Sequence, residues 1–396
     1  MKIVHICLNG PYTDNWGYQE NIIPKYHKKF GNKVIVIAQN QKHIDTGEIV
    51  EAKCADYYLE DGVRVIRVAK QKMFNMKFVN VFSPYDIYTL LLDLKPDFIM
   101  VHGLIGSISA LNVGKYIRKN NRKCIAVADI HQDYYNSNVE NNTKGRVLAF
   151  VHRFLNKRMF PYYKKVFYVA PSCKKKAEEY YRVPKNLLEL LPLGCDTELI
   201  NISNRESVRK EIRSKYNLNE DDIIVCHGGK LDFKKKTLEL IYAIKKLNQE
   251  NSKVKLIIFG SFADKSKARI EKEILKNNDY IIFAGMLKPE EYYNIYLASD
   301  IAAFPGGQSV LWQQAIACGL AMLVKRHTGI EYLDLGGNIA FFDNDSIEEI
   351  YNKLSGIILD NQYKEMKKVA EEKGAQYFSY ERISKQVLDY AIGDTK

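Results

Sequence analysis

One segment of the chain reads Phe304-Pro-Gly-Gly-Gln-Ser-Val-Leu-Trp-Gln-Gln-Ala-Ile-Ala-Cys-Gly319. An apolar run at 301–304 opens it, a helix-forming stretch occupies 310–318, and a second apolar run follows at 320–324. This order predicts a strand, a glycine loop, a helix and another strand. A glycine loop that opens a helix presents backbone N–H groups to an anionic or hydroxyl-rich ligand. We therefore expect a ligand site at this strand end, where α/β domains usually bind their ligands.

The same alternation runs through the whole chain and predicts the α/β class, with parallel sheets covered by helices on both faces. In the first half we expect strands at 2–8, 34–38, 63–68, 98–102, 124–129, 165–169 and 187–191, and helices at 18–30, 84–92, 107–119, 144–163 and 174–181. In the second half we expect strands at 223–227, 255–259, 280–284, 301–304, 321–324 and 339–342, and helices at 237–250, 268–276, 289–298, 310–318, 346–359, 362–376 and 380–391.

The length of 396 residues exceeds that of one ordinary domain and indicates two. We expect a first domain at 1–200, a polar connection at 201–220, and a second domain at 221–375. The C-terminal helix, within 376–396, either closes the second domain or crosses back to the first. Two such α/β domains are expected to hold their ligand in a cleft between them, at the carboxyl ends of their strands.

Composition indicates a cytoplasmic protein. No run reaches the roughly 18 apolar residues of a membrane span, and the apolar run at 2–8 is too short for a signal peptide. The seven cysteines are scattered without a CxxC pair, which argues against a zinc site and against a disulfide framework.

The net charge of +12 is concentrated in one part of the chain, since residues 101–185 hold 17 Lys and Arg against 5 Asp and Glu. This excess fits either an ordinary solvated surface or a face for an anionic membrane or a phosphate-bearing acceptor. Within it, residues 144–160 carry basic side chains beside an apolar stripe, a pattern typical of interfacial helices and also of packed surface helices. The stripe consists of Val147, Phe150, Val151, Phe154 and Leu155. No nucleic-acid partner is expected, because no recognised binding module accompanies the charge.

A second loop of the same half reads Cys226-His-Gly-Gly-Lys-Leu-Asp-Phe-Lys-Lys-Lys236. Gly229 allows the backbone to approach a ligand closely, and Lys230 and Lys235 add positive charge. A diphosphate requires this combination of close N–H donors and cations. The simpler interpretation is a set of solvated lysines at a helix start, which fits Lys234 better than it fits Lys230 or Lys235.

Together these segments resemble the retaining GT-B glycosyltransferases, especially glycosyltransferase family 4. The resemblance covers nearly the whole chain and is most specific at 223–331, including Phe259-Gly260, Ile281-Ile-Phe-Ala-Gly-Met286 and Gln314-Ala-Ile-Ala-Cys-Gly319. It implies two Rossmann-like domains facing across a cleft, a nucleotide-diphosphate sugar as donor, retention of anomeric configuration, and no cofactor or metal. Lys230 and Lys235 stand where the family has an arginine and a lysine that hold the donor diphosphate.

The resemblance also implies donor contacts, with two departures. Where the family carries two glutamates eight positions apart, this chain has Gly306 and Gln314. Gln314 can still hydrogen-bond a ribose as a neutral amide. The remaining donor-binding candidates are the turn glycine before the first helix, the loop after the strand at 301–304, and an acidic residue near the nucleotide: Gly17, Gly307, Gln308, Ser309 and Glu331.

In the first domain the resemblance assigns His131 to the donor sugar and places Asn15, Trp16 and His102 near the acceptor. A single histidine is more often structural, and the loop at 8–19 is also compatible with an ordinary strand–helix connection. The expected catalytic set is His131, Lys230 and Lys235.

We therefore expect a hexosyltransferase-type enzyme of bacterial surface polysaccharide or glycoconjugate synthesis, acting on a hydroxyl of a glycan or lipid-linked acceptor at the inner face of the membrane. Two alternatives remain open. One is a non-catalytic GT-B subunit that binds a sugar nucleotide or glycan and supports a partner enzyme; the other is a sugar-nucleotide epimerase.

Overall fold

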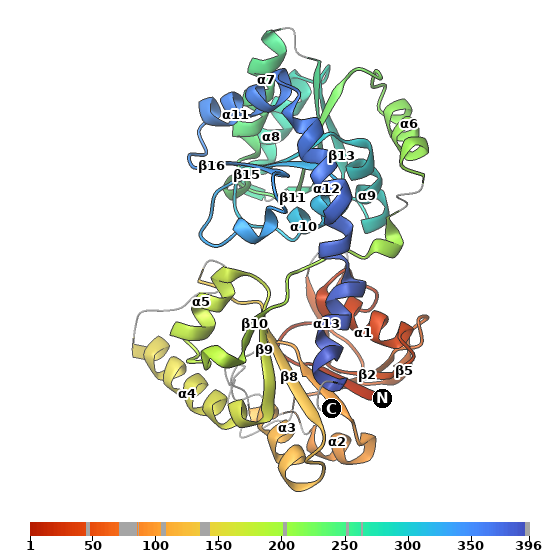
Figure 1. The fold of residues 1–396 in the computed structure, drawn as a ribbon, viewed down its shortest axis with the longest axis vertical. Helices are drawn as coiled ribbons and strands as arrows, with labels where there is room; N and C mark the ends of the chain where they lie inside the picture. Colours follow the sequence, from red (N-terminus) through yellow and green to blue (C-terminus); the bar gives the residue numbers. More distant parts are fainter. Residues whose placement is uncertain are drawn as a thin grey trace. The chain divides into compact units, whose positions relative to one another are not determined.

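The computed structural model describes residues 1–44, 48–70, 85, 87–103, 108–134, 143–200, 204–250, 253–262 and 264–392. The chain forms two compact units (Figure 1). Unit 1 contains Met1–Pro192 and the segment that begins at Ile383, and unit 2 contains Leu193–Arg382. Each unit is a mainly parallel sheet with helices packed against it, so the predicted α/β class is confirmed.

The described strands of unit 1 form an eight-stranded sheet in the order β10-β9-β8-β7-β1-β2-β6-β5. All neighbours are parallel except β5 and β6. The chain builds outward from β1 in both directions, so the order reverses between β1 and β7. The bounds are β1 Lys2–Cys7, β2 Lys33–Gln39, β5 Asp56–Tyr58, β6 Arg64–Val68, β7 Phe98–Val101, β8 Ile125–Ile130, β9 Tyr163–Tyr168 and β10 Leu188–Leu190.

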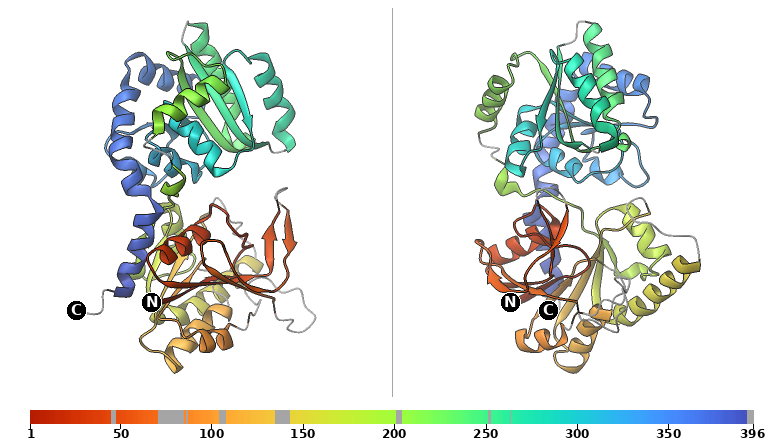
Figure 2. Two further views of the ribbon diagram at one scale, coloured as in Figure 1. Left: turned by 90° about the vertical axis from the view of Figure 1, so that its right-hand side faces the viewer. Right: turned by 180° about the vertical axis from the view of Figure 1, so that it is seen from behind.

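Helices α1 Gln19–Lys29, α2 Tyr88–Leu94, α3 Ile108–Lys119, α4 Thr143–Met159 and α5 Pro171–Glu179 connect these strands. The start of the helix expected at 84–92 and the first residue of that expected at 107–119 lie outside the described residues. An antiparallel ribbon, β3 Gln41–His43 with β4 Ile49–Glu51, was not predicted (Figure 2). Its strands are three residues long and only partly buried, so they carry no apolar run.

Unit 2 holds a six-stranded parallel sheet in the order β13-β12-β11-β14-β15-β16. Alternate strand residues enter two separate cores, as Ile224 and Val225 illustrate. Helices α6, α9 and α10 pack on one face, and α7, α8 and α11 pack on the other. The bounds are β11 Ile223–Leu231, β12 Val254–Phe262, β13 Ile281–Gly285, β14 Ile301–Phe304, β15 Ala321–Lys325, β16 Ile339–Phe342, α6 Arg205–Lys215, α7 Thr237–Gln249, α8 Asp264–Lys276, α9 Pro289–Ala298, α10 Leu311–Ala317 and α11 Ile347–Leu359.

The predicted connection at 201–220 requires correction, because it contains α6 and belongs to unit 2. Val208 and Ile212 enter the core, and Arg209 donates to the buried Asp300 carboxylate at 3.0 Å. The division between the units falls instead at Pro192 and Leu193. The helix was missed because it offers few apolar residues among many charged ones.

Helix α12, Gln362–Phe378, packs within unit 2, and α13, Tyr380–Ile392, joins unit 1 from Ile383 onward. Gln386 Nε2 donates to Glu189 Oε1 at 3.0 Å and to the Leu190 carbonyl at 2.9 Å. Of the two alternatives predicted for the C-terminal helix, the structure shows the return to the first domain. In the described part of the chain, none of the helices combines the length and apolar character needed to cross a bilayer.

Candidate active site

The strand order of unit 2 places β11 beside β14, with the sheet growing outward from this pair in both directions. In open α/β sheets ligands bind at this switch point, beyond the carboxyl ends of the strands. The two loops that sequence analysis selected meet there. The Gly307 N–H donates to the Lys234 carbonyl at 3.0 Å, and Lys235 Nζ donates to the Gly307 and Gln308 carbonyls at 3.0 and 2.8 Å.

The lysine loop is fixed by Asp232, whose carboxylate accepts the N–H groups of Lys234 and Lys235 at 2.9 and 3.1 Å. These residues form a single 3₁₀ turn, η6 Phe233–Lys235. Burial lowers the pKa of the Lys235 ammonium, against the opposing effect of Asp232. Lys230 is exposed, and within the described residues its ammonium has no acidic partner, so it is available to an anion.

Gly306 stands where the family has its first glutamate, and the structure explains the departure. A Cβ atom at this position would lie 2.1 Å from the Lys234 carbonyl oxygen and 2.5 Å from Lys235 Cα. Both atoms belong to the backbone, so no side-chain rotation can relieve the contact. The close approach that brings Lys235 to the glycine loop is therefore incompatible with a glutamate at 306.

Gln314 lies on α10 and is only 4% exposed, yet its Oε1 has no hydrogen-bond partner. A buried acceptor without a donor costs about 1–3 kcal/mol, and a ligand hydroxyl would relieve this cost. Ser309 Oγ accepts the Leu311 N–H at 3.3 Å and shapes the start of the same helix. Glu331 lies apart from these contacts, with an exposed side chain 3.8 Å from an Arg326 nitrogen. Its assignment to the nucleotide stays a prediction.

In unit 1 the strand order reverses between β1 and β7, and Asn9 Nδ2 joins the two strand ends by donating to the His102 carbonyl at 2.8 Å. His102 itself is buried. Its Nδ1 lies 2.8 Å from Asp129 Oδ2 and its Nε2 lies 3.0 Å from His5 Nδ1. Both ring nitrogens are thus engaged inside the unit, and the predicted acceptor contact of His102 is replaced by an internal role.

His131 follows β8 and keeps a third of its side chain exposed, with Nε2 3.3 Å from Asp129 Oδ1. Burial opposes its charged form, but the Asp129 carboxylate raises the pKa of His131 above its ordinary value. Asp129 also accepts the Gly103 N–H at 2.7 Å. Sequence analysis did not select Asp129 as a site residue. The available signal was an ionisable residue within an apolar strand, two positions before the candidate histidine.

The loop after β1 is held by an ion pair between Asp14 and Arg67 at 2.8 Å. Trp16 stacks on His43 of the unpredicted ribbon, with ring centroids 5.1 Å apart. Asn15 and Gly17 are exposed. The structure therefore gives Trp16 one packing partner and leaves the acceptor and donor roles of all three residues as predictions.

The apolar stripe predicted at 144–160 lies on α4, where part of it is buried and part of it is exposed. Leu155 is buried within unit 1, whereas Val147, Phe150 and Phe154 are 59%, 68% and 48% exposed. The Arg158 guanidinium lies over the Phe154 ring, 3.4 Å from its centroid. The exposed side of α4 thus combines apolar rings with positive charge.

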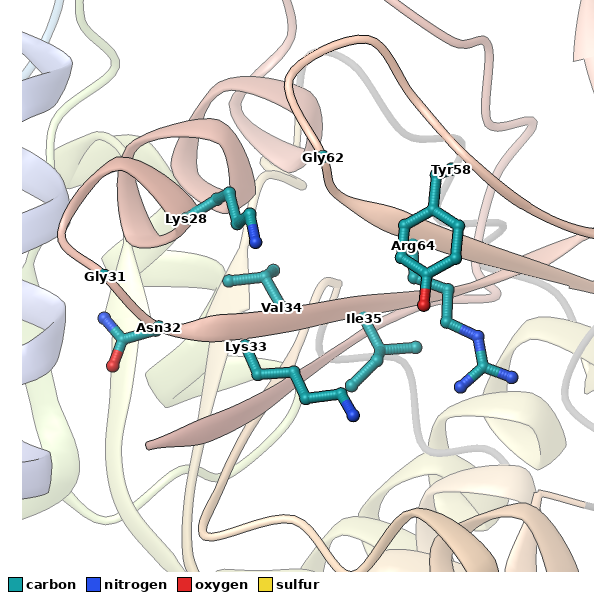
Figure 3. A pocket seen from close by; sticks show the side chains of 9 residues that line it. All are labelled: Lys28, Gly31, Asn32, Lys33, Val34, Ile35, Tyr58, Gly62 and Arg64. Carbon is teal, nitrogen blue, oxygen red and sulfur yellow. The ribbon is translucent and has the colours of Figure 1, made fainter.

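A separate pocket of about 360 Å³ opens in unit 1 where β2 begins (Figure 3). Two of its cations, Lys28 and Lys33, have no acidic partner among the described residues, whereas Arg64 pairs with Asp56. It lies at the amino end of β2, away from the carboxyl ends where the candidate residues gather. Its lining is Lys28, Gly31, Asn32, Lys33, Val34, Ile35, Tyr58, Gly62 and Arg64.

Comparison with known proteins supports the resemblance inferred from sequence. Residues 208–376 match the family model described as "Glycosyl transferases group 1". Solved structures share the fold across the chain: a glycosyltransferase from Rickettsia africae ESF-5 (TM-score 0.70, 16% identity, 100% of this chain and 99% of that one) and Anabaena Alr3699/HepE in complex with UDP (0.69, 14%, 98% and 99%). The chain therefore has the GT-B fold of these glycosyltransferases, and the match to the family model falls within its second unit.

Two relatives are similar in sequence over part of the chain. The "Lipopolysaccharide 1,2-N-acetylglucosaminetransferase" of Salmonella typhimurium is 23% identical over 55% of this chain and 60% of its own length. The "Alpha-monoglucosyldiacylglycerol synthase" of Streptococcus pneumoniae is 24% identical over 29% and 26%. The matches thus cover less than two thirds of either relative.

Proposed function

We propose that this protein transfers a sugar from a nucleoside diphosphate to a hydroxyl of a glycan or lipid-linked acceptor, with retention of configuration. The observation that carries the proposal is the contact of Lys235 with the glycine loop at the switch point of unit 2. The buried Oε1 of Gln314, which has no hydrogen-bond partner, adds an atom in the same domain that can accept a hydrogen bond from a ligand hydroxyl. The complex of the structural relative Alr3699/HepE with UDP is consistent with a nucleotide site in this fold.

In the proposed reaction the bond between the anomeric carbon and the diphosphate oxygen breaks while the acceptor oxygen bonds to the same face of that carbon. The proton of the acceptor hydroxyl passes to the departing phosphate. Lys230 and Lys235 stabilise the negative charge that develops on the diphosphate, as preorganised cations do most effectively in a partly buried site. His131 orients a donor or acceptor hydroxyl, and no metal or other cofactor takes part.

We also propose that the protein is cytoplasmic and binds the membrane peripherally through α4. Exposed rings flanked by cations are what an interfacial helix presents to anionic lipids. The names of both sequence relatives, a lipopolysaccharide N-acetylglucosaminetransferase and a monoglucosyldiacylglycerol synthase, fit a lipid-linked acceptor. Flotation with anionic vesicles tests this: Phe150→Ser should weaken binding, and binding that is unchanged would remove α4 from the membrane contact.

Gly306 favours the alternative of a non-catalytic subunit, since a glutamate at this position, as the family has it, is sterically excluded. The epimerase alternative has no specific observation in its favour.

Turnover of sugar nucleotides distinguishes these functions. UDP, GDP, ADP and dTDP sugars are incubated with the protein and membrane extract, and sugar release and transfer are followed. One donor should be consumed, with slow hydrolysis when acceptor is omitted. Binding of a diphosphate without any turnover would favour the non-catalytic subunit, and a changed sugar on an intact nucleotide would favour the epimerase.

A further inference from the structure

Unit 1 contains an unbroken line of hydrogen-bonded rings that starts at Asp129 and ends in α13. Asp129 Oδ2 lies 2.8 Å from His102 Nδ1, and His102 Nε2 lies 3.0 Å from His5 Nδ1. His5 Nε2 lies 3.1 Å from His27 Nδ1, and His27 Nε2 lies 3.1 Å from the Ser384 carbonyl oxygen. All six ring nitrogens are therefore engaged, and the three rings are buried.

The four contacts need four protons, since each hydrogen bond contains one. The Ser384 carbonyl can only accept, and so can Asp129 when it is ionised. Three neutral imidazoles supply three protons, one each. With only three protons, one of the four contacts would have no hydrogen atom. Two lone pairs would then face each other at about 3 Å in a buried site.

Asp129 is not the source of the missing proton. Its carboxylate accepts bonds from the Gly103 N–H and His131 as well as from His102. Burial alone would raise the pKa of Asp129, but His131 and His102 hold it well below its usual range. Within the described residues, none of the lysines or arginines pairs with this buried carboxylate, so the rings must balance its charge.

The fourth proton belongs on His102, the ring that touches the carboxylate. Burial lowers the pKa of His5 well below its ordinary value and that of His27 to about 3, so both of these rings are neutral. With His102 doubly protonated, His5 and His27 each carry hydrogen on Nε2, and every contact has one donor and one acceptor. The other ionisable groups that face the line are His131, Glu20, Cys7 and Tyr163.

We propose that His5, His27, His102 and Asp129 form a buried proton-sharing line that holds one more proton than three neutral imidazoles carry, and that this line positions His131 through Asp129. The ion pair of His102 with Asp129 leaves one carboxylate oxygen to orient His131 and limits the charge that His131 experiences. The far end of the line anchors α13 through Ser384. A shared metal is not the explanation, because the described residues contain no group of three or more ligands arranged to hold one.

Nitrogen-15 NMR of the full-length protein, labelled in its histidine rings, tests the proton count directly, since the ring nitrogen shifts distinguish the two neutral tautomers from the imidazolium. At pH 7.5 we expect one imidazolium assigned to His102, with His5 and His27 protonated at Nε2. Three neutral rings, or His27 protonated only at Nδ1, would overturn the proposal.

Two variants of His27 form a matched pair. His27→Gln keeps one acceptor for His5 and one donor for Ser384, whereas His27→Phe removes both. The imidazolium signal of His102 should persist in His27→Gln and be perturbed in His27→Phe. Asp129→Asn should abolish it, because the charge that retains the proton is gone. If a variant does not fold, the spectrum of the unmodified protein still decides the count.

The proposed positioning of His131 rests on the proposed function, but the titration midpoint of His131 can be measured without turnover. His102→Gln keeps a donor to Asp129 and removes the charge, so the titration midpoint of His131 should rise by about one pH unit. The pH profile of sugar transfer should move in the same direction. A shifted midpoint without transfer activity would leave the positioning role intact and count against the enzyme function; transfer with an unshifted midpoint would remove the positioning role.

Discussion

The two units arrange their strands in a similar way but place different residues at the strand ends. Each reverses its strand order at one point, between β1 and β7 in unit 1 and between β11 and β14 in unit 2. At its reversal unit 2 brings together glycines, backbone carbonyls and Lys235. At its own, unit 1 brings together His5, His102 and Asp129.

Under the proposed function, this difference separates two tasks of the enzyme. A diphosphate needs fixed N–H donors and permanent positive charge, which glycines and lysines provide. A sugar or acceptor hydroxyl needs a group that can orient it, and in the proposed function His131, which contacts Asp129, has this role. In this proposal two sheets that each reverse their strand order support two chemistries, because the loops rather than the sheets carry the reacting groups.

The largest effect is expected from removing the ammonium group of Lys235 in unit 2. Lys235→Ala should lower the rate of donor turnover by about 10²–10³-fold, the loss typical when one preorganised electrostatic contact disappears. Lys234→Ala is the matched control, because Lys234 is the neighbouring residue and its side chain is exposed. Turnover assays and circular dichroism on both variants check the prediction. Equal rates in the two variants would remove Lys235 from the site.

The close packing of the two loops in unit 2 can be broken by one methyl group. Gly306→Ala should destabilise the protein by about 3 kcal/mol, since the new Cβ meets backbone atoms at 2.1 and 2.5 Å. Gly307→Ala is the control, as a Cβ there has no neighbour within 4 Å. Urea unfolding measures both. Equal stability of the two variants would show that the loops are not held together as described.

The proposed contact of Gln314 with a ribose hydroxyl should contribute less. Gln314→Leu replaces a buried amide of similar size, and it should weaken nucleotide binding about tenfold, the loss of roughly one hydrogen bond. The protein itself should not be destabilised through Oε1, because that atom has no hydrogen-bond partner in the structure. Calorimetry with the preferred nucleoside diphosphate provides the measurement, and undiminished affinity would count against the contact.

A further effect concerns pH. Burial lowers the pKa of His27 in unit 1 to about 3 and that of His227 in unit 2 to about 4. Both groups bind protons on unfolding, so stability should fall as the pH drops from about 6.5 toward about 4, by up to about 1.4 kcal/mol per pH unit for each group.

The two tryptophans, Trp16 and Trp312, lie in different units, so fluorescence of Trp16→Phe and Trp312→Phe follows each unit separately. Urea midpoints at pH 7, 6 and 5 should decrease for both. A midpoint that does not change with pH in unit 2 would show that His227 is not neutral in the folded state, and in unit 1 it would show the same of His5 and His27.

The sequence predicted the sheets well because their strands are apolar runs with regular helices between them. Its most specific site predictions lie in unit 2, where glycines and lysines mark backbone approach and charge. The structure brings Lys235 and Gly307 into contact, and their roles stay predictions. They were weakest where tertiary contacts decide. Nothing local shows that His102 is buried against His5, which lies 97 positions earlier. Likewise α6 has too few apolar positions to stand out until Asp300 supplies a partner for its arginines.

The most direct measurement is a crystal structure of the protein with its preferred nucleoside diphosphate. The account predicts that the diphosphate lies at the switch point of unit 2, within hydrogen-bond reach of Lys230 or Lys235, with a ribose hydroxyl donating to Gln314 Oε1. A diphosphate bound elsewhere, for instance between Lys28 and Lys33 at the amino end of β2, with the Lys235 loop untouched, would contradict it.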